Sequence, residues 1–391
     1  MTNRPTSPYL TWFDGYEESD RVRVGGKNAS LGSMINAGLP VPPGFAVTTD
    51  AYDIFGTRPD LNEEIKRVIG NVDPEDVAGL QTVSREVRDL IESQPVPDDV
   101  ATAVTTAYDA LCEYCDVDRM PVAVRSSATA EDLPDSSFAG QQDTFLWVMG
   151  ADAVLENMRR CWSSLFTDRA IAYRRERGFD NVHVSMSVGV QKMVDPKASG
   201  VAFTLDPATG DRSKVAIDAS WGLGEAVVSG QVTPDNYLVD KVILEVCSRK
   251  ISHKHVEFRV NGAGIEMADV EDERADAPCL TDEEVRAVTA MAKRAERHYG
   301  QPQDVEWAID RHLPDGDNIV LLQSRPETVW SNRPRPKVAT SSGDPIASIV
   351  STLCSPLHAS RNGQSAEPVG GGESVEHEAE ASEQEAEASN T

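Results

Sequence analysis

The chain has 391 residues, of which 40% are apolar, enough for two or three domains, or one large divided domain, with a full hydrophobic core. Its 64 acidic residues against 37 basic ones give a net charge of −27, which argues against nucleic acid or an anionic membrane as a partner. No apolar run approaches the ~18 residues of a membrane-spanning helix, and neither the N-terminus nor the scattered cysteines indicate secretion. We therefore expect a cytoplasmic protein.

The basic residues are mostly arginine. Only 10 of the 37 are lysine, and residues 1–337 alone carry a net charge of −19. Carboxylates hold water, and concentrated salt screens their mutual repulsion. This composition favours a halophilic protein from a salt-rich cytosol, with an ordinary acidic protein that carries an acidic tail as the alternative.

The expected elements alternate between helices and strands. Periodic apolar residues predict helices over 27–37, 98–115, 152–177 and 281–299, and strands over 121–125, 182–193 and 215–219. The helix over 281–299 has the clearest ends, because Thr281 and Glu284 form a capping box and Gly300 follows the helix. This mixture indicates an α/β or α+β fold.

The apolar pattern stops near residue 331. Pro334 and Pro336 interrupt it, three glycines follow at 370–372, and the rest is rich in Glu, Ala and Ser. Such a composition buries too little apolar surface to fold, so we expect residues 333–391 to form a linker and a disordered acidic tail.

Gly25, Gly26 and Lys27 stand at the start of the first expected helix. Two glycines let backbone amides approach an anion, the helix N-terminus favours negative charge, and a lysine supplies a mobile cation for phosphate oxygens. The segment is no Walker motif, so a plain turn is the simpler interpretation of these residues alone.

Arg125 stands at the end of an apolar strand, before a cluster of small hydroxyl residues. The planar fork of donors on its guanidinium suits a phosphate oxygen. The alternative is a salt bridge to one of the nearby acids, Glu131, Asp132 or Asp135.

Three further segments carry weaker signals. A glycine-rich bend at 221–225 follows a strand, a setting for either a ligand or a packing corner. Cys112 and Cys115 lack a second pair at zinc spacing, so a helix with two half-buried cysteines is favoured. His253 and His255 alternate on an expected strand, without support for a metal.

Residues 304–325 predict a β-hairpin. The run 304–310 alternates between two faces, Pro-Asp-Gly at 314–316 is a turn signal, and the apolar run from residue 319 begins the return strand.

One face of this hairpin predicts a ligand site. If Asp310 pairs with Ile319, the register places Glu306 opposite Gln323, and Arg325 shares their face. A carboxylate and an amide oxygen suit Mg²⁺, and the arginine beside them suits a polyphosphate. The alternative is a cross-strand salt bridge between Glu306 and Arg325 with no ligand.

Taken in order, these segments resemble the ATP-binding region of the phosphoenolpyruvate synthase (pyruvate, water dikinase) family, a module shared with pyruvate phosphate dikinase and rifampin phosphotransferase. The resemblance runs from about Phe13 to Trp330 and rests on Gly25–Ser30, Val122–Thr129, Gly140–Thr144, Phe203–Gly210, Trp221–Glu225, Thr233–Tyr237, Asp304–Ala308 and Gln323–Trp330. It implies an ATP-grasp-like α+β fold, with subdomains at 1–190 and 191–332 that close on ATP, ahead of the tail at 333–391.

The resemblance also implies the residues that hold Mg-ATP. It places Lys27, Arg125 and Arg325 at the phosphates as the catalytic set, with Arg325 at the β- and γ-phosphates. It assigns Glu306 and Gln323 to Mg²⁺, in agreement with the interpretation of the hairpin. Three further residues complete the nucleotide contacts: Gln191, which would hold the adenine, and Thr144 and Glu225.

Members of the family continue with a domain that carries a phosphorylated histidine and a domain that binds the acceptor. Here the only hint of a histidine motif is Cys354-Ser355-Pro356-Leu357-His358. The resemblance therefore implies transfer of a phosphoryl group from ATP to a histidine on a separate phosphohistidine/pyruvate-binding polypeptide. The alternatives are a module of an antibiotic (rifampin-type) phosphotransferase and a non-catalytic, ATP-binding regulatory paralogue.

Overall fold

The structure is a computed structural model, and it describes residues 4–70, 72–128, 143–177, 185–262 and 264–331. Within these residues helices and antiparallel strands are mixed, in agreement with the expected α+β class. The expected linker and tail at 333–391, which include His358, lie outside the described residues.

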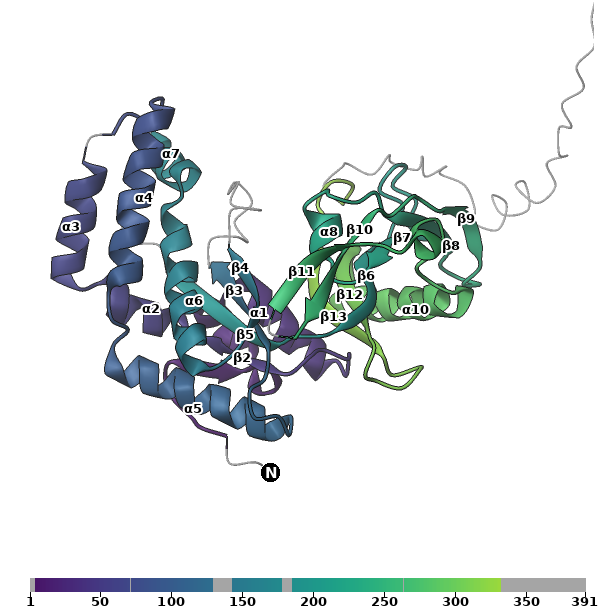
Figure 1. The fold of residues 1–391 in the computed structure, drawn as a ribbon, viewed down its shortest axis with the longest axis horizontal. Helices are drawn as coiled ribbons and strands as arrows, with labels where there is room; N and C mark the ends of the chain where they lie inside the picture. Colours follow the sequence, from purple (N-terminus) through teal and green to yellow (C-terminus); the bar gives the residue numbers. More distant parts are fainter. Residues whose placement is uncertain (1–3, 71, 129–142, 178–184, 263, 332–391) are drawn as a thin grey trace, which may run out of the picture. The chain divides into compact units, whose positions relative to one another are not determined.

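The first sheet is covered on one face by helices. Its strand order is β1 (Leu10–Trp12), β2 (Gly44–Val47), β5 (Met186–Lys192), β3 (Val122–Ala128) and β4 (Thr144–Val148). Apolar side chains of these strands share one core with helices α2 (Thr49–Gly56), α3 (Pro59–Ile69), α4 (Val77–Ser93), α5 (Asp98–Tyr114), α6 (Ala151–Ser163) and α7 (Asp168–Arg177), which Figure 1 shows in purple to teal.

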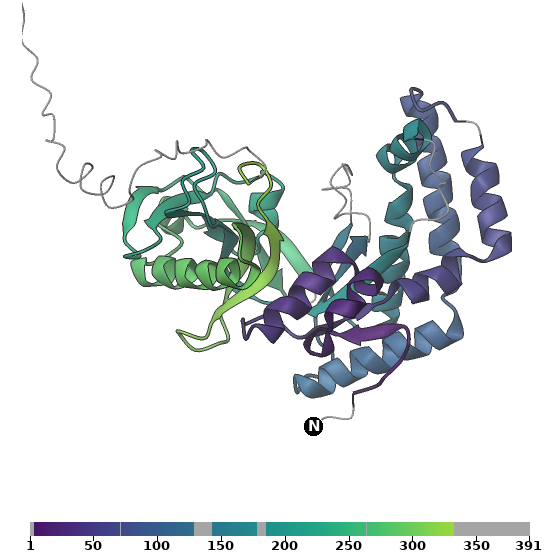
Figure 2. The ribbon, with the colours of Figure 1, turned by 180° about the vertical axis from the view of Figure 1, so that it is seen from behind.

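Helix α1 (Arg21–Asn36) lies against the other face of the first sheet, as the view from behind shows (Figure 2). On β5, Val188 faces the core of the covering helices, whereas Ser187 and Gly189 contact α1. The buried apolar residues of α1, such as Leu31 and Met34, belong to the core of the second sheet. Helix α1 thus joins the two halves of the fold.

The second sheet has the strand order β13 (Ile319–Pro326), β12 (Gln303–Asp310), β6 (Pro196–Phe203), β7 (Lys214–Trp221), β8 (Asp235–Asp240) and β9 (Val246–Lys250). Helix α10 (Asp282–Tyr299) packs on it through Val285 and Val288. The remaining elements are the hairpin of β10 (Val256–Asn261) and β11 (Gly264–Asp269), the short helices α8 (Glu225–Val228) and α9 (Asp272–Ala275), and the 3₁₀ turns η1 (Phe13–Gly15), η2 (Glu18–Asp20) and η3 (Ser164–Phe166).

The chain passes from the first sheet to the second between residues 193 and 195. The boundary expected between 190 and 191 would therefore fall inside β5. The division into two nucleotide-binding subdomains stays a prediction.

The single helix expected over 152–177 is wrong, because the chain breaks between α6 and α7. The hydroxyl groups of Ser163 and Ser164 donate to the carbonyls of Arg160 and Cys161. Thr167 then adopts an extended conformation and its Oγ1 accepts from the N–H of Ala170 at 3.3 Å, which starts α7. Local side-chain bonds of this kind compete with helix propagation, and apolar periodicity does not reveal them.

The other sequence predictions have mixed outcomes. Helix α10 begins with the expected capping box of Thr281 and Glu284 and ends at Gly300, which has the left-handed φ of 68°. The strand expected at His253 and His255 is wrong, because β9 ends at Lys250 and β10 begins at Val256.

Candidate functional site

Lys27 is held against β3 by a kink in α1. Gly25 has φ 70° and ψ 168°, and a Cβ atom there would lie 2.4 Å from the carbonyl oxygen of Ser127, so only glycine fits. After the kink the chain resumes a helix, and Lys27 Nζ donates to the carbonyl of Ser126 at 3.4 Å. Gly25 therefore lets the helix approach the strand that carries Arg125.

Arg125 reaches from the first sheet to the second. It lies on β3 between Gly189 of β5 and Thr144 of β4. Its Nη1 donates to the carbonyl of Leu322 on β13 at 3.3 Å, and its buried Nε has no hydrogen-bond partner among the residues that the structure describes. The acids proposed as its alternative partners, Glu131, Asp132 and Asp135, lie outside the described residues.

The hairpin of β12 and β13 pairs Glu306 with Gln323, as expected, but the assumed pairing of Asp310 with Ile319 is wrong. Ile309 pairs with Ile319, and a β-bulge after Glu306 shifts the register by one residue. The extra residue on β13 is Leu322, the residue whose carbonyl accepts from Arg125. The bulge thus lies where the two sheets meet and bends the return strand.

The alternative of a Glu306–Arg325 salt bridge is wrong. Arg325 pairs with Asp304, with Nε and Oδ2 3.5 Å apart. Within the described residues the side chains of Glu306 and Gln323 form no hydrogen bond or ion pair, and both are half-buried. A carboxylate and an amide oxygen therefore face each other across the hairpin without a protein partner.

Asp304 is a further carboxylate of this face, to which the sequence analysis assigned no role. It lies two residues before Glu306 on the same strand, and its buried Oδ1 has no hydrogen-bond partner in the described part of the chain. Burial raises the pKa of its carboxyl, Arg325 lowers it and Glu327 raises it, and the net direction is upward. The two-residue spacing on an alternating strand was the signal that could have found Asp304.

Thr144 and Glu225 line a common hollow of about 790 Å³. Thr144 opens β4 next to Arg125, and Glu225 opens α8 after the glycine-rich bend. At that bend Gly222 has φ 69° and a Cβ would lie 2.2 Å from the carbonyl of Phe258, so the first glycine permits close backbone packing. Arg119 and Arg160 also line the hollow, together with the aromatic residues Phe145 and Trp147, so its described lining is both polar and aromatic.

Gln191 does not face this hollow. It lies on β5 between Gly44 and Ala123, its side chain is only 2% exposed, and its Nε2 donates to the carbonyl of Pro42 at 3.4 Å. A contact between this side chain and adenine would require the amide to become accessible, so its role stays a prediction.

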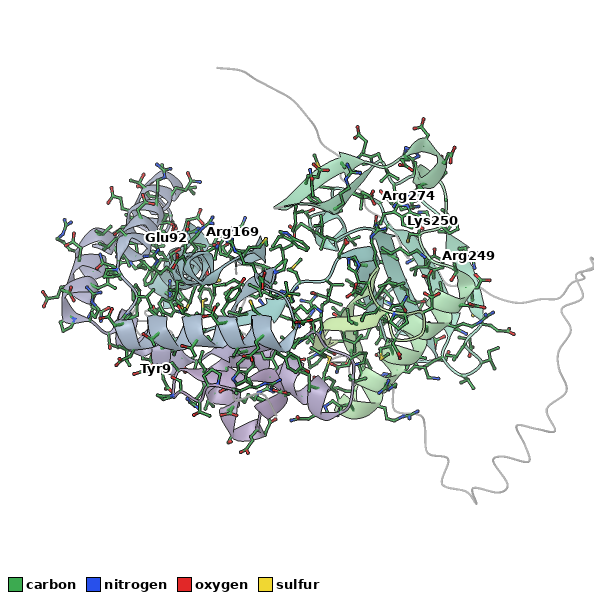
Figure 3. All side chains as sticks on the ribbon, turned by 60° about the horizontal axis from the view of Figure 1, so that its bottom comes forward. Tyr9, Glu92, Arg169, Arg249, Lys250 and Arg274 are labelled. Carbon is green, nitrogen blue, oxygen red and sulfur yellow. The ribbon has the colours of Figure 1, made fainter. Side chains whose placement is uncertain are left out.

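Two arginines outside these segments form ion pairs with acidic side chains. Arg274, labelled in Figure 3, donates to both carboxylate oxygens of Glu257 at 3.0 Å and stacks over Trp221. Arg249, labelled on the same half, is paired with Asp282. Among the described residues, no group of three or more His, Cys, Asp and Glu side chains could hold a metal ion. None of the described helices is long and apolar enough to span a membrane.

Comparison with known proteins assigns the family. Residues 21–343 match the family described as "Pyruvate phosphate dikinase, AMP/ATP-binding domain", and this chain belongs to that family. A relative from Methanothermobacter thermautotrophicus named "Probable phosphoenolpyruvate synthase" is 46% identical over 320 residues, which cover 82% of this chain and 46% of the relative.

Other relatives agree with this assignment. The "Phosphoenolpyruvate synthase" of Pyrococcus furiosus is 41% identical over 82% of this chain and 44% of its own length, and a "Probable phosphoenolpyruvate synthase" of Staphylothermus marinus is 43% identical over 85% and 43%. The chain spans less than half the length of these relatives. A crystal structure from Pyrococcus horikoshii covers 68% of the chain at 15% identity with a TM-score of 0.30, too low to inform the fold.

Proposed function

We propose that this chain is a phosphotransferase module of the phosphoenolpyruvate synthase type, which binds Mg-ATP in an ATP-grasp-like fold and passes a phosphoryl group to a histidine on a separate domain or polypeptide. The observation that carries the proposal is the contact of Arg125 with the bulge of β13, within a member of an AMP/ATP-binding family. That contact brings the guanidinium of Arg125 to the strand that carries Gln323 and Arg325.

The residues of the hairpin fit a magnesium ion. Among the described residues, the side chains of Glu306 and Gln323 face each other without protein partners, and the carboxylate of Asp304 lies on the same face. Mg²⁺ prefers hard oxygen ligands and is usually held by one or two carboxylates together with substrate phosphates and water. When bound, the ion would neutralise charge on the phosphate oxygens.

The cationic side chains would bind and orient the triphosphate. Lys27 supplies an ammonium group from α1, and Arg125 offers from β3 an Nε that has no hydrogen-bond partner among the described residues. Arg325 is exposed on β13 and is held from one side by Asp304. Fixed cations around the phosphates favour transfer, because they stabilise oxygen charge in the transition state and hold the reacting groups in line.

The alternatives are less well supported. The relatives cited above are named phosphoenolpyruvate synthase, which favours this type over an antibiotic phosphotransferase module. The presence of every side chain assigned to Mg-ATP weighs against a non-catalytic regulatory paralogue.

The first prediction concerns the hairpin. Glu306→Gln removes a charged metal ligand and Arg325→Lys removes the planar fork, so both variants should keep the melting temperature within a few degrees and lose most phosphoryl transfer. Glu306→Gln should also weaken the dependence of ATP binding on Mg²⁺. Calorimetry with ATP at several Mg²⁺ concentrations, and labelled ATP mixed with a candidate histidine domain, measure these effects.

The matched controls are Glu266→Gln and Arg259→Lys, because these residues form a cross-strand pair on the hairpin of β10 and β11. We expect both controls to bind ATP like the unmodified chain. Unchanged ATP affinity and transfer in the Glu306 and Arg325 variants would show that the β12–β13 hairpin is structural. No binding of ATP by the unmodified chain at any salt concentration would overturn the proposed function as a whole.

A further inference from the structure

Asn28, the residue after Lys27, is almost fully buried between α1 and the first sheet, with 3% of its surface exposed. Its Nδ2 donates to the carbonyl of Val24 at 3.0 Å, inside α1, and to Oγ of Ser187 on β5 at 3.0 Å. Its backbone N–H lies 3.5 Å from Oγ of Ser127 on β3. Asn28 therefore joins both sides of the kink at Gly25 to two strands of the sheet, to β5 through its side chain and to β3 through its backbone N–H.

The amide oxygen of Asn28 also fixes the spacing between α1 and the strand next to Arg125. A Cβ atom at Gly189 would lie 2.3 Å from Asn28 Oδ1, so the helix approaches the sheet as closely as a glycine permits. Gly189 is the cross-strand partner of Arg125. Asn28 thus follows Lys27 in the chain and contacts the cross-strand partner of Arg125, while its amide nitrogen donates to two protein acceptors.

Another side chain of α1 contacts the second sheet and the helix α10 that packs on it. Ser30 Oγ donates to the carbonyl of Ser324 on β13 at 2.7 Å and lies 3.0 Å from Oη of Tyr299. The turn of α1 that follows Lys27 is therefore tied to both sheets, to the first through Asn28 and to the hairpin through Ser30. The placement of α1 therefore determines where Lys27 lies relative to the two sheets.

We infer that Asn28 is a positioning residue that fixes the start of α1 on the first sheet and thereby holds Lys27 beside Arg125 for the phosphates of ATP. The inference rests on the proposed function and adds a residue that does not itself touch the nucleotide. An asparagine suits this role because its amide donates twice from one rigid group and carries no charge that burial would penalise. Loss of the amide would let the kink relax and would move the ammonium group of Lys27.

The test is a double-mutant cycle on ATP affinity, measured by calorimetry at the salt concentration that gives the highest melting temperature. Lys27→Ala should weaken binding of Mg-ATP by about tenfold or more, as expected for one charged contact. Asn28→Ala should produce a loss of the same order, and the double variant should bind no more weakly than Lys27→Ala alone, because both changes remove the same interaction.

Asn36→Ala is the matched control. Asn36 lies eight residues further along α1, and its Nδ2 donates to the carbonyl of Tyr16 at 2.9 Å, so the substitution removes a comparable bond away from Lys27. It should lower the melting temperature and leave ATP affinity unchanged. The control separates loss of helix stability from loss of Lys27 placement.

The outcomes distinguish the inference from the proposed function. Unchanged ATP affinity in Asn28→Ala, or additive losses in the double variant, would overturn the inference while the proposed function stands. Absence of ATP binding by the unmodified chain would instead reject the proposed function. If Asn28→Ala fails to fold, Ser187→Ala decides, since it removes only one acceptor of the amide: a loss of about threefold supports the inference, and no loss overturns it.

Discussion

The ionised carboxylate of Asp304 destabilises the folded state. Burial is the largest cause of its raised pKa, Glu327 adds to it, and the ion pair with Arg325 compensates only in part. A raised pKa in the folded state means that Asp304 contributes its full stability below the pKa of the unfolded chain. That contribution is lost as the pH rises through the folded pKa. Residues of binding sites often carry such a cost.

The second prediction follows from that sign. Asp304→Asn removes the titration, so this variant should melt at a higher temperature than the unmodified chain at pH 7. The difference should shrink as the pH falls toward about 4 and vanish well below it, where the carboxyl is protonated in both states. Thermal melts between pH 3 and pH 8 measure it.

Asp240 supplies a control of the opposite sign. A hydrogen bond from Lys214 lowers the pKa of its carboxyl to about 2. Asp240→Asn should therefore melt at a lower temperature than the unmodified chain at pH 7. A lower melting temperature for Asp304→Asn at neutral pH would contradict the assigned direction at Asp304.

At the scale of single elements, the capping box at the start of α10 shows how a short sequence motif determines where a helix begins. The N–H of Glu284 donates to Thr281 Oγ1 at 3.2 Å, and the N–H of Thr281 donates to Glu284 Oε2 at 2.8 Å. The helix then places Val285 and Val288 in the core of the second sheet. The capping box therefore fixes where the buried stripe of α10 begins.

The third prediction is that Thr281→Ala lowers the free energy of unfolding by about 1 kcal/mol, the usual cost of losing an N-cap side chain. Denaturant titration monitored by circular dichroism measures it. Thr106→Ala is the control, because the hydroxyl of Thr106 is exposed in α5 and donates only to the carbonyl four residues earlier, at 2.8 Å. Equal losses in the two variants would contradict a specific role of the capping box.

At the scale of the whole molecule, charge is the dominant feature. A net charge of −27 spread over a chain with only 10 lysines leaves carboxylates that repel one another. Ion pairs such as Lys241 with Glu296, 2.9 Å apart, offset only part of the repulsion. We propose that the protein is adapted to concentrated salt.

The fourth prediction is that the melting temperature rises as sodium chloride is raised from low to molar concentration, because the salt screens repulsion between carboxylates. Sucrose at matched osmolality is the control, since it acts by exclusion from the surface and does not screen charge. A melting temperature that stays flat or falls with salt would remove the halophilic interpretation. If sucrose raises the melting temperature as much as salt does, the effect of salt would come from exclusion of the solute from the protein surface instead of from screening of charge.

Much of the fold and the hairpin face could be predicted from local pattern. The alternation in β12 and the turn signal after it predict that Glu306 and Gln323 face each other, and they do. The pairing assumed next to the turn, Asp310 with Ile319, was nevertheless wrong by one residue. Glu306 still pairs with Gln323 because the bulge shifts the register by one residue. A bulge depends on how both flanking strands and Arg125 pack, so no local periodicity contains it.

By itself, the sequence determined the family, the mixture of helices and strands, and the ends of α10, because short-range periodicity and capping chemistry are encoded within a few residues. Only the tertiary structure decided that Arg125 contacts β13, that Arg325 pairs with Asp304, and that Asn28 ties α1 to the first sheet. It also decided that Lys254 and Asp235 form a fully buried ion pair. These contacts join residues far apart in the chain, and their partners are selected by the packing of both sheets around α1, which no window of neighbouring residues describes.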